Sequence, residues 1–239
     1  MGNHDVHEII GGIGHWITQR TFYSGDHIAV VDGERRISYA ELDRRTDQLA
    51  SALRDRGVRQ GDRVASLQYN SATFLELLFA TAKLGAIFVP INFRLAAPEI
   101  SYLLADSGAD VFVWSAPLAG LARAALTGDG VRVRLCVTVG GDPSGDEKHY
   151  DTLLDSGGPR PLGMRVPGSD VAMLMYTSGT TGRPKGVRRA PPSAEQAMMT
   201  GMIIGQAFGF MGYGPPDQMV TVVTGPMYHS APNAYGLTA

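Results

Sequence analysis

A stretch rich in glycine, hydroxyl groups and one lysine has the residue types that polyphosphate binding requires. It covers residues 176–187 and reads Tyr-Thr-Ser-Gly-Thr-Thr-Gly-Arg-Pro-Lys-Gly-Val. The glycines allow positive φ angles and a close approach of the backbone to a ligand. Backbone N–H groups, serine and threonine hydroxyls and a positive charge on one loop can together hold phosphate oxygens. The candidate ligands are Thr177, Ser178, Gly179, Thr180, Thr181, Gly182 and Lys185.

This stretch is not a Walker A loop, whose pattern is G-x-x-x-x-G-K-[ST]. Counting from Gly179, Pro184 occupies the second glycine position, and Gly186 follows the lysine where a magnesium-binding hydroxyl is required. A glycine- and threonine-rich hairpin turn without a ligand is the alternative interpretation. Twelve residues in this order favour a ligand-binding loop.

The stretch resembles the phosphate-binding loop of the AMP-forming adenylating enzymes, which include acyl-CoA synthetases, coumarate-CoA ligases, luciferases and peptide-synthetase adenylation domains. Their pattern, [YF]-[TS]-S-G-[TS]-T-G-x-P-K-G-V, is matched at every position. The resemblance implies an enzyme that couples a carboxylate to the α-phosphate of ATP, releases pyrophosphate and passes the acyl group to a thiol. It implies ATP, Mg²⁺ and coenzyme A as cofactors, with Lys185 as a catalytic residue and Thr180 as a magnesium contact.

A second segment strengthens this resemblance. The family has a P-[ML]-[FY]-H segment after a strand, and residues 226–229 match it behind the predicted strand 219–223. The resemblance places His229 beside the carboxylate and the α-phosphate, where an imidazole can orient the acid and help to exclude water. Without the resemblance, a loop histidine is interpreted as structural or solvated. Residues 187–192 depart from the family, which often places a Thr-His pair there.

Alternating strand and helix patterns precede the loop and must position it. Ser38 and Glu41 form a capping-box pattern, and Ser71 can cap the next helix. Strands that alternate with helices predict parallel βαβ units, so we expect an α/β fold with a layered, mostly parallel sheet and flanking helices. Residues 28–37 predict a hairpin with Asp32-Gly33 as its turn, and residues 1–20 have little pattern. The predicted helices cover residues 38–56, 71–83, 98–106 and 117–126, and the predicted strands cover 61–67, 86–91, 110–114, 132–139 and 170–175.

The order of these elements also resembles the early part of acyl-CoA synthetases, at residues 37–42, 61–65, 83–86 and 90–92. The resemblance implies an incomplete N-terminal large domain, with a first βαβ region over about 1–160. Residues 161–239 would hold the phosphate-loop region and the start of the acyl-binding region. Family members are roughly twice as long as these 239 residues, so we expect a fragment or a natural truncation that is inactive alone. Exposed apolar surface and self-association are expected from an unfinished domain.

Composition excludes several other classes of protein. A net charge of −2 and a pI of about 6.3 argue against a nucleic-acid partner. Cys136 is the only cysteine, so no intrachain disulfide can form, which favours a reducing cytoplasm. It lies in a strand pattern and is expected to be buried. No signal peptide is recognisable, and the uncharged run 197–216 contains five glycines, so no transmembrane segment is expected.

These observations favour an AMP-forming acyl-CoA synthetase that acts on a small-molecule carboxylic acid. Apolar residues and small glycines near 197–211 favour fatty or aromatic acids, although this segment can equally be a tightly packed helix face. Fatty acid metabolism is the corresponding physiological expectation. The alternatives are an adenylating enzyme with an acceptor other than CoA, and a non-catalytic nucleotide-binding or interaction fragment.

Overall fold

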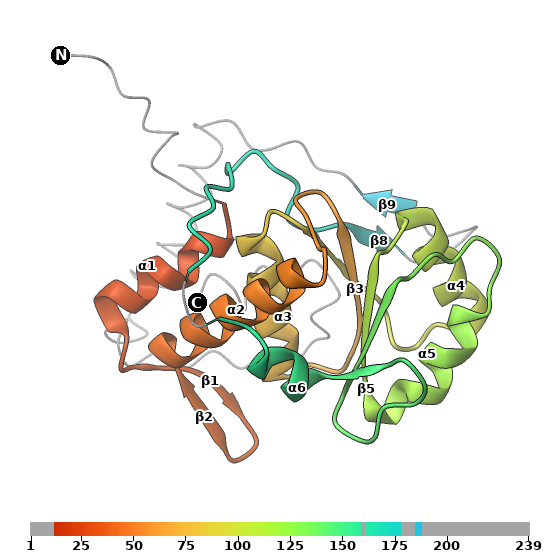
Figure 1. Ribbon diagram of the computed structural model, residues 1–239, viewed down its shortest axis with the longest axis horizontal. Coiled ribbons are helices and arrows are strands. Elements are labelled where there is room, and N and C mark those ends of the chain that lie inside the picture. Colours follow the sequence, from red (N-terminus) through yellow and green to blue (C-terminus); the bar gives the residue numbers. More distant parts are fainter. Residues whose placement is uncertain (1–11, 159–160, 178–184, 188–239) are drawn as a thin grey trace, which may run out of the picture. The chain divides into compact units, whose positions relative to one another are not determined.

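The computed structural model describes residues 12–158, 161–177 and 185–187 of the chain (Figure 1). The chain divides into two compact units, residues 1–186 and 187–239, and the described helices and strands lie in the first unit, apart from Val187 at the end of the last strand. The helices are α1 (Gly14–Ser24), α2 (Tyr39–Asp55), α3 (Ala72–Lys83), α4 (Ala97–Ser107), the 3-10 turn η2 (Ala116–Leu118), α5 (Ala119–Leu126) and α6 (Tyr150–Asp155). The strands are β1 (Ile28–Asp32), β2 (Arg35–Ser38), β3 (Arg63–Leu67), β4 (Ile87–Pro90), β5 (Val111–Ser115), β6 (Leu135–Val139), β7 (Lys148–His149), β8 (Met175–Thr177) and β9 (Lys185–Val187).

A parallel sheet forms the centre of this unit, with the strand order β4-β3-β5-β6-β7. Ala65 of β3 lies opposite Val89 of β4 on one side and opposite Phe112 of β5 on the other. Parallel neighbours need a crossover segment between them, which α3, α4 and α5 provide for β3 to β6. The predicted α/β class with a mostly parallel sheet and flanking helices is therefore confirmed.

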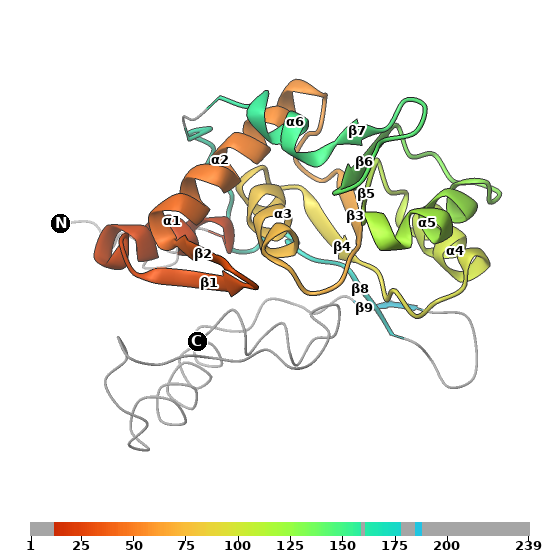
Figure 2. The ribbon, with the colours of Figure 1, turned by 90° about the horizontal axis from the view of Figure 1, so that it is seen from below.

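Helices cover both faces of the sheet (Figures 1 and 2). The helices α4 and α5 lie on one face, whereas α3 and α6 lie on the other with α2 packed against them. On the first face, Trp114 of β5 is buried with Leu104 and Ala122 of the two helices. On the second face, the rings of Phe88 and Phe74 meet edge to face, with their centroids 5.1 Å apart. Successive strand side chains point to opposite faces, so apolar strands fill both layers.

Serine hydroxyls fix the beginnings of α2 and α3, as the sequence predicts. The Glu41 N–H donates to Ser38 Oγ at 3.2 Å, and the Phe74 N–H donates to Ser71 Oγ at 3.2 Å. Each bond satisfies one of the backbone N–H groups that the first helical turn leaves free. The helix boundaries expected from these residues are confirmed to within a residue or two.

Two features near the N-terminus differ from the sequence predictions. Residues 1–20 show little pattern, yet α1 begins at Gly14, and its aromatic residues Trp16 and Phe22 are exposed. An apolar stripe on one face is what makes a helix recognisable in a sequence, and α1 lacks one. The hairpin turn is Gly33–Glu34, because Asp32 pairs with Arg35 as the last residue of β1.

Two predicted strands are shorter than expected. The strand predicted over 132–139 begins at Leu135, and the Arg134 guanidinium just before it donates to the carbonyl oxygens of Arg56 and Gly57, at 2.7 and 2.9 Å. The buried strand predicted over 170–175 is regular only from Met175, and residues 171–176 are half-buried. The earlier part of this segment lies along the outer side of β4, where Phe88 binds Ala172 and Leu174.

Large apolar side chains are exposed on this unit at Trp16, Phe22, Tyr23, Ile28, Val31 and Tyr69. Singly exposed apolar side chains are common on protein surfaces, so the apolar surface expected from an unfinished domain and self-association both stay predictions. Within the described ranges, no helix has both the length and the apolar character that crossing a bilayer requires.

A buried carboxylate joins three helices on the second face of the sheet. Glu76 of α3 has a fully buried side chain, and the Arg45 guanidinium of α2 donates to both its oxygens, at 2.7 and 2.9 Å. The Tyr150 hydroxyl of α6 donates to Glu76 Oε2 at 2.5 Å, and Arg35 Nη2 lies 3.8 Å from Oε1. Burial, and then the neighbouring Glu76 charge, raise the pKa of Tyr150 well above its ordinary value, so this hydroxyl remains a donor.

The close approach of α1 to α3 predicts an unusual response to a glycine-to-alanine substitution. A Cβ atom on Gly14 would lie 2.7 Å from the backbone nitrogen of Lys83, whereas a Cβ on exposed Gly120 of α5 would meet no atom within 4 Å. Gly120→Ala should stabilise the protein by about 0.5–1 kcal/mol, because alanine is the better helix former. Gly14→Ala should instead destabilise it by roughly 1–3 kcal/mol, because overpacking forces the backbone to shift. Urea unfolding of both variants tests this, and equal stabilisation would contradict the predicted contact.

Candidate functional site

The segment that leads to the predicted phosphate loop lies against the edge strand of the parallel sheet. The Phe88 N–H of β4 donates to the Ala172 carbonyl, the Leu174 N–H donates to the Phe88 carbonyl, both at 2.9 Å, and Met173 forms a parallel bridge with Phe88. The segment therefore runs in the same direction as β4. Its continuation β8 emerges at the carboxyl ends of the strands, which is where ligands bind in open α/β sheets.

The structure brings the two ends of the predicted loop together. The strand β8 ends at Thr177, β9 begins at Lys185, and the two strands form a separate two-stranded sheet. Seven residues connect them, which is short enough for a compact loop but long enough to surround a ligand group. The backbones of two predicted ligands, Thr177 and Lys185, therefore lie on paired strands.

The other predicted site residues lie outside the described part of the chain. These are the loop residues Ser178, Gly179, Thr180, Thr181 and Gly182, and the substrate-site candidate His229. The predicted strand 219–223 also lies outside it. Their roles in binding phosphate, magnesium and the carboxylate stay predictions.

A tyrosine–aspartate hydrogen bond holds the end of β8. Tyr176 Oη donates to Asp106 Oδ2 at 2.7 Å, across to the last turn of α4. The Tyr176 ring is half-buried and packs against the apolar cluster between the sheet, α4 and α5. Burial, and then the hydrogen bond to Asp106, raise the pKa of Tyr176 above its ordinary value, so the hydroxyl stays protonated and can donate. Tyr176 belongs to the predicted motif, whereas Asp106 was not predicted; its only signal in the sequence is an acidic residue at a helix C-terminus.

Three buried polar side chains bind one another at the carboxyl end of β3. Gln68 Nε2 donates to Ser66 Oγ and Thr73 Oγ1 donates to Gln68 Oε1, both at 2.9 Å. These three side chains are almost fully buried and satisfy one another. They fix the connection from β3 to α3.

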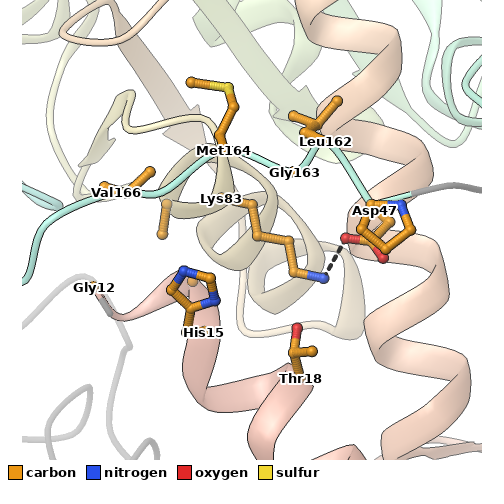
Figure 3. A pocket seen from close by; sticks show the side chains of 12 residues that line it. Gly12, His15, Thr18, Asp47, Lys83, Leu162, Gly163, Met164 and Val166 are labelled. Carbon is orange, nitrogen blue, oxygen red and sulfur yellow. Dashed lines mark hydrogen bonds and ion pairs between the residues drawn. The ribbon is translucent and has the colours of Figure 1, made fainter. Parts of the chain in front are cut away.

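A cavity of about 120 Å³ lies elsewhere, between α1, α2, α3 and residues 161–166 (Figure 3). In Figure 3 the Lys83 ammonium points at Asp47, and the two groups are 2.6 Å apart. Lys83 also binds Asp43 at 2.6 Å, and Thr18 Oγ1 donates to the same carboxylate at 2.8 Å. The charged groups here are therefore paired with one another. None of the residues around the cavity belongs to β8 or β9, so this cavity is distinct from the predicted phosphate site.

The described residues contain no cluster of three or more histidine, cysteine, aspartate or glutamate side chains that could hold a metal ion. The predicted magnesium contact, Thr180, lies outside the described residues, and its role stays a prediction.

Cys136 is a half-buried residue of β6 rather than a fully buried one. Burial, and then the nearby Glu147 carboxylate, raise its pKa to about 11. We therefore expect iodoacetamide to label the folded protein slowly at pH 7–9 and faster as the pH approaches 11, since only the thiolate is the nucleophile. The raised pKa favours folding fully below the pKa of the unfolded thiol, and this contribution is lost as the pH rises through about 11. Rapid labelling of the folded protein at pH 7 would contradict the assignment.

One protein family matches almost the whole chain. The sequence model of this family, described as AMP-binding enzyme, matches residues 18–238. The match includes the described sheet, the predicted phosphate loop and the segment that contains His229.

Two of the individual proteins with similar sequences are named as CoA-thioester-forming enzymes. A feruloyl-CoA synthase from Amycolatopsis sp is 43% identical over 175 residues, which are 73% of this chain and 32% of that protein. The long-chain-fatty-acid–CoA ligase FadD13 of Mycobacterium tuberculosis is 39% identical over 168 residues, which are 68% of this chain and 31% of that protein. The chain therefore spans about a third of the length of these relatives.

The fold is similar to that of a solved domain. The inhibitor-bound N-terminal domain of FACL13 from Mycobacterium tuberculosis superposes with a TM-score of 0.75 and 31% identity. The superposition covers 96% of this chain and 55% of that domain. The expectation that the chain corresponds to part of such an N-terminal domain is confirmed.

Proposed function

This chain belongs to the AMP-binding enzyme family, and we propose that it is the phosphate-loop part of an AMP-forming acyl-CoA synthetase. The reaction converts a carboxylic acid, ATP and CoA into an acyl-CoA thioester, AMP and pyrophosphate. The observation that supports this most is the motif 176–187, whose two ends lie on paired strands beyond the carboxyl ends of a parallel sheet. The names of the relatives support the same class of reaction.

The loop residues would hold the β- and γ-phosphates of ATP. Backbone N–H groups and the hydroxyls of residues 177–182 donate to phosphate oxygens, and Lys185 contributes a full positive charge. The acyl carboxylate, oriented by His229, attacks the α-phosphorus in line. A carboxylate–phosphorus bond forms and the bond to pyrophosphate breaks, so negative charge grows on the leaving pyrophosphate, where the loop donors stabilise it. Magnesium, held through Thr180 and the phosphates, would neutralise part of the same charge.

The thiol of CoA would complete the second step. It attacks the carbonyl carbon of the acyl-adenylate and gives up its proton, the carbon–sulfur bond forms, and AMP leaves with the electron pair of the broken carbon–oxygen bond of the mixed anhydride. Apolar and glycine residues near 197–211, together with one aromatic-acid and one fatty-acid relative, support a fatty or aromatic acid as substrate. A cytoplasmic location belongs to this proposal and is supported by the single cysteine.

Two measurements on the 239-residue chain test the proposal. Calorimetry with Mg-ATP should show binding at a single site, because the phosphate contacts lie within the chain. A coupled pyrophosphate assay with ferulate or a fatty acid, ATP, Mg²⁺ and CoA should show no robust turnover, because the chain spans about a third of the length of its relatives. A chain that fails to bind ATP would overturn the proposal, whereas robust turnover would refute the expected inactivity of the chain alone. The same assay on the full-length protein, with and without CoA, identifies the acceptor.

A further inference from the structure

We propose that Asp106 is a positioning residue for the phosphate loop. Its carboxylate anchors Tyr176 and thereby fixes the end of β8, from which the chain continues into residues 178–184. The inference rests on the proposed function, because the loop that it serves is the proposed triphosphate site. Asp106 does not contact the substrate in this proposal; it only fixes the position at which the loop begins.

A series of contacts fixes the segment before the loop, and the tyrosine contact is the last of them. Gln60 Nε2 donates to Asp170 Oδ2 at 2.7 Å, and the backbone of Phe88 then binds Ala172 and Leu174. Tyr176 follows two residues later and is the final residue before the loop whose side-chain contacts the structure describes. Any freedom at Tyr176 is therefore passed directly to Thr177 and the loop.

The position of Asp106 is unfavourable for its own helix. It lies in the last turn of α4, which contains no basic residue, and a carboxylate there faces the negative end of the helix dipole. Among the described residues, no lysine, arginine or histidine forms an ion pair with it. Its hydrogen bonds in the described part of the chain come from two tyrosine hydroxyls, Tyr176 at 2.7 Å and Tyr102 at 3.4 Å. The short hydrogen bond from Tyr176 offsets the unfavourable interaction of the Asp106 carboxylate with the helix dipole.

The hydrogen bond is of the stronger kind, because its acceptor is ionised. Leu174 and the Tyr176 ring pack on the apolar cluster beneath α4 and keep β8 near its place when the bond is removed. We therefore expect a shift in the position of the loop rather than unfolding. Loss of one such bond corresponds to about tenfold or more, and because the packing keeps β8 near its place, we expect only part of this loss at the loop, a roughly three- to tenfold weaker ATP binding.

Three single variants and one double variant of the 239-residue chain test the inference. Tyr176→Phe keeps the ring and removes only the donor, and Asp106→Asn removes only the charge of the acceptor. Tyr102→Phe is the matched control, because it removes a longer hydrogen bond to the same carboxylate from within α4 itself. Each variant is measured for Mg-ATP affinity by calorimetry and, without nucleotide, for amide hydrogen exchange in peptides covering residues 175–187.

We expect faster exchange over residues 175–187 and roughly three- to tenfold weaker ATP binding in Tyr176→Phe and Asp106→Asn, with Tyr102→Phe like the wild type. The double variant Tyr176→Phe/Asp106→Asn should be no weaker than the worse single variant, because both remove one contact. Unchanged exchange in Tyr176→Phe overturns the inference whatever the nucleotide result. Faster exchange with unchanged ATP affinity also overturns it, since the contact would then be merely structural. Failure of the wild-type chain to bind ATP overturns the proposed function, and the exchange comparison still decides whether Asp106 holds the end of β8.

Discussion

Replacing Lys185 by alanine should reduce adenylation by the full-length protein by about 10²–10³-fold, the usual loss when one donor to a developing oxyanion is removed. The backbone of Lys185 begins β9, directly after the loop and next to β8. Its charge is proposed to stabilise the negative charge that grows on the leaving pyrophosphate. ATP–pyrophosphate exchange measures this step without the thiol acceptor. Urea unfolding of the same variant should change little, because the expected role is in the transition state and not in folding.

Lys148→Ala is the matched control for this experiment. Lys148 is an exposed residue of β7, a short strand at the other edge of the sheet from β4. The Lys148→Ala substitution also removes one positive charge but leaves the loop unchanged, so it separates a local effect of Lys185 from an effect of net charge. A normal exchange rate in Lys185→Ala, with normal stability, would remove Lys185 from the mechanism.

Replacing Glu76 by alanine should destabilise the protein by about 3 kcal/mol, because it leaves the partly buried Arg45 charge without its partner. The hydroxyl of Tyr150, a residue that is only 1% exposed, would lose its acceptor as well. The free energy of unfolding in urea measures the effect. Glu34→Ala is the control, since Glu34 is an exposed residue of the hairpin turn and its loss should change stability by less than about 0.5 kcal/mol.

A double-mutant cycle identifies the source of the loss at Glu76. If the uncompensated Arg45 charge is responsible, Arg45→Ala/Glu76→Ala should be more stable than the sum of the two single effects by about 0.5–3 kcal/mol. Additive effects would instead indicate that the lost packing of α3 dominates. ATP affinity should be unaffected by this network at temperatures where the variants remain folded, because the network lies on helices α2, α3 and α6 and not on β8 or β9.

Local signals in the sequence predicted most of the sheet and its helices. Ser38 and Ser71 mark helix starts through hydrogen bonds that span only three residues, so the pattern is visible without the fold. The strand that contains Phe112 and Trp114 is apolar throughout because helices cover both its faces. By contrast, α1 has no single apolar face to recognise, and the strand before the loop is partly irregular because β4 fixes it through only two backbone hydrogen bonds.

The sequence by itself determined the chemistry that we propose for this protein. The order of glycines, hydroxyls and one lysine over residues 176–187 predicts a phosphate-binding loop, because a loop of this kind binds through residue types that are adjacent in the chain. Only the tertiary structure decided what fixes the end of β8, from which this loop begins. Asp106 and Tyr176 are separated by 70 residues, and Glu76 and Tyr150 by 74. No local pattern encodes such pairs, since they meet only when the parallel sheet brings distant helices and strands together.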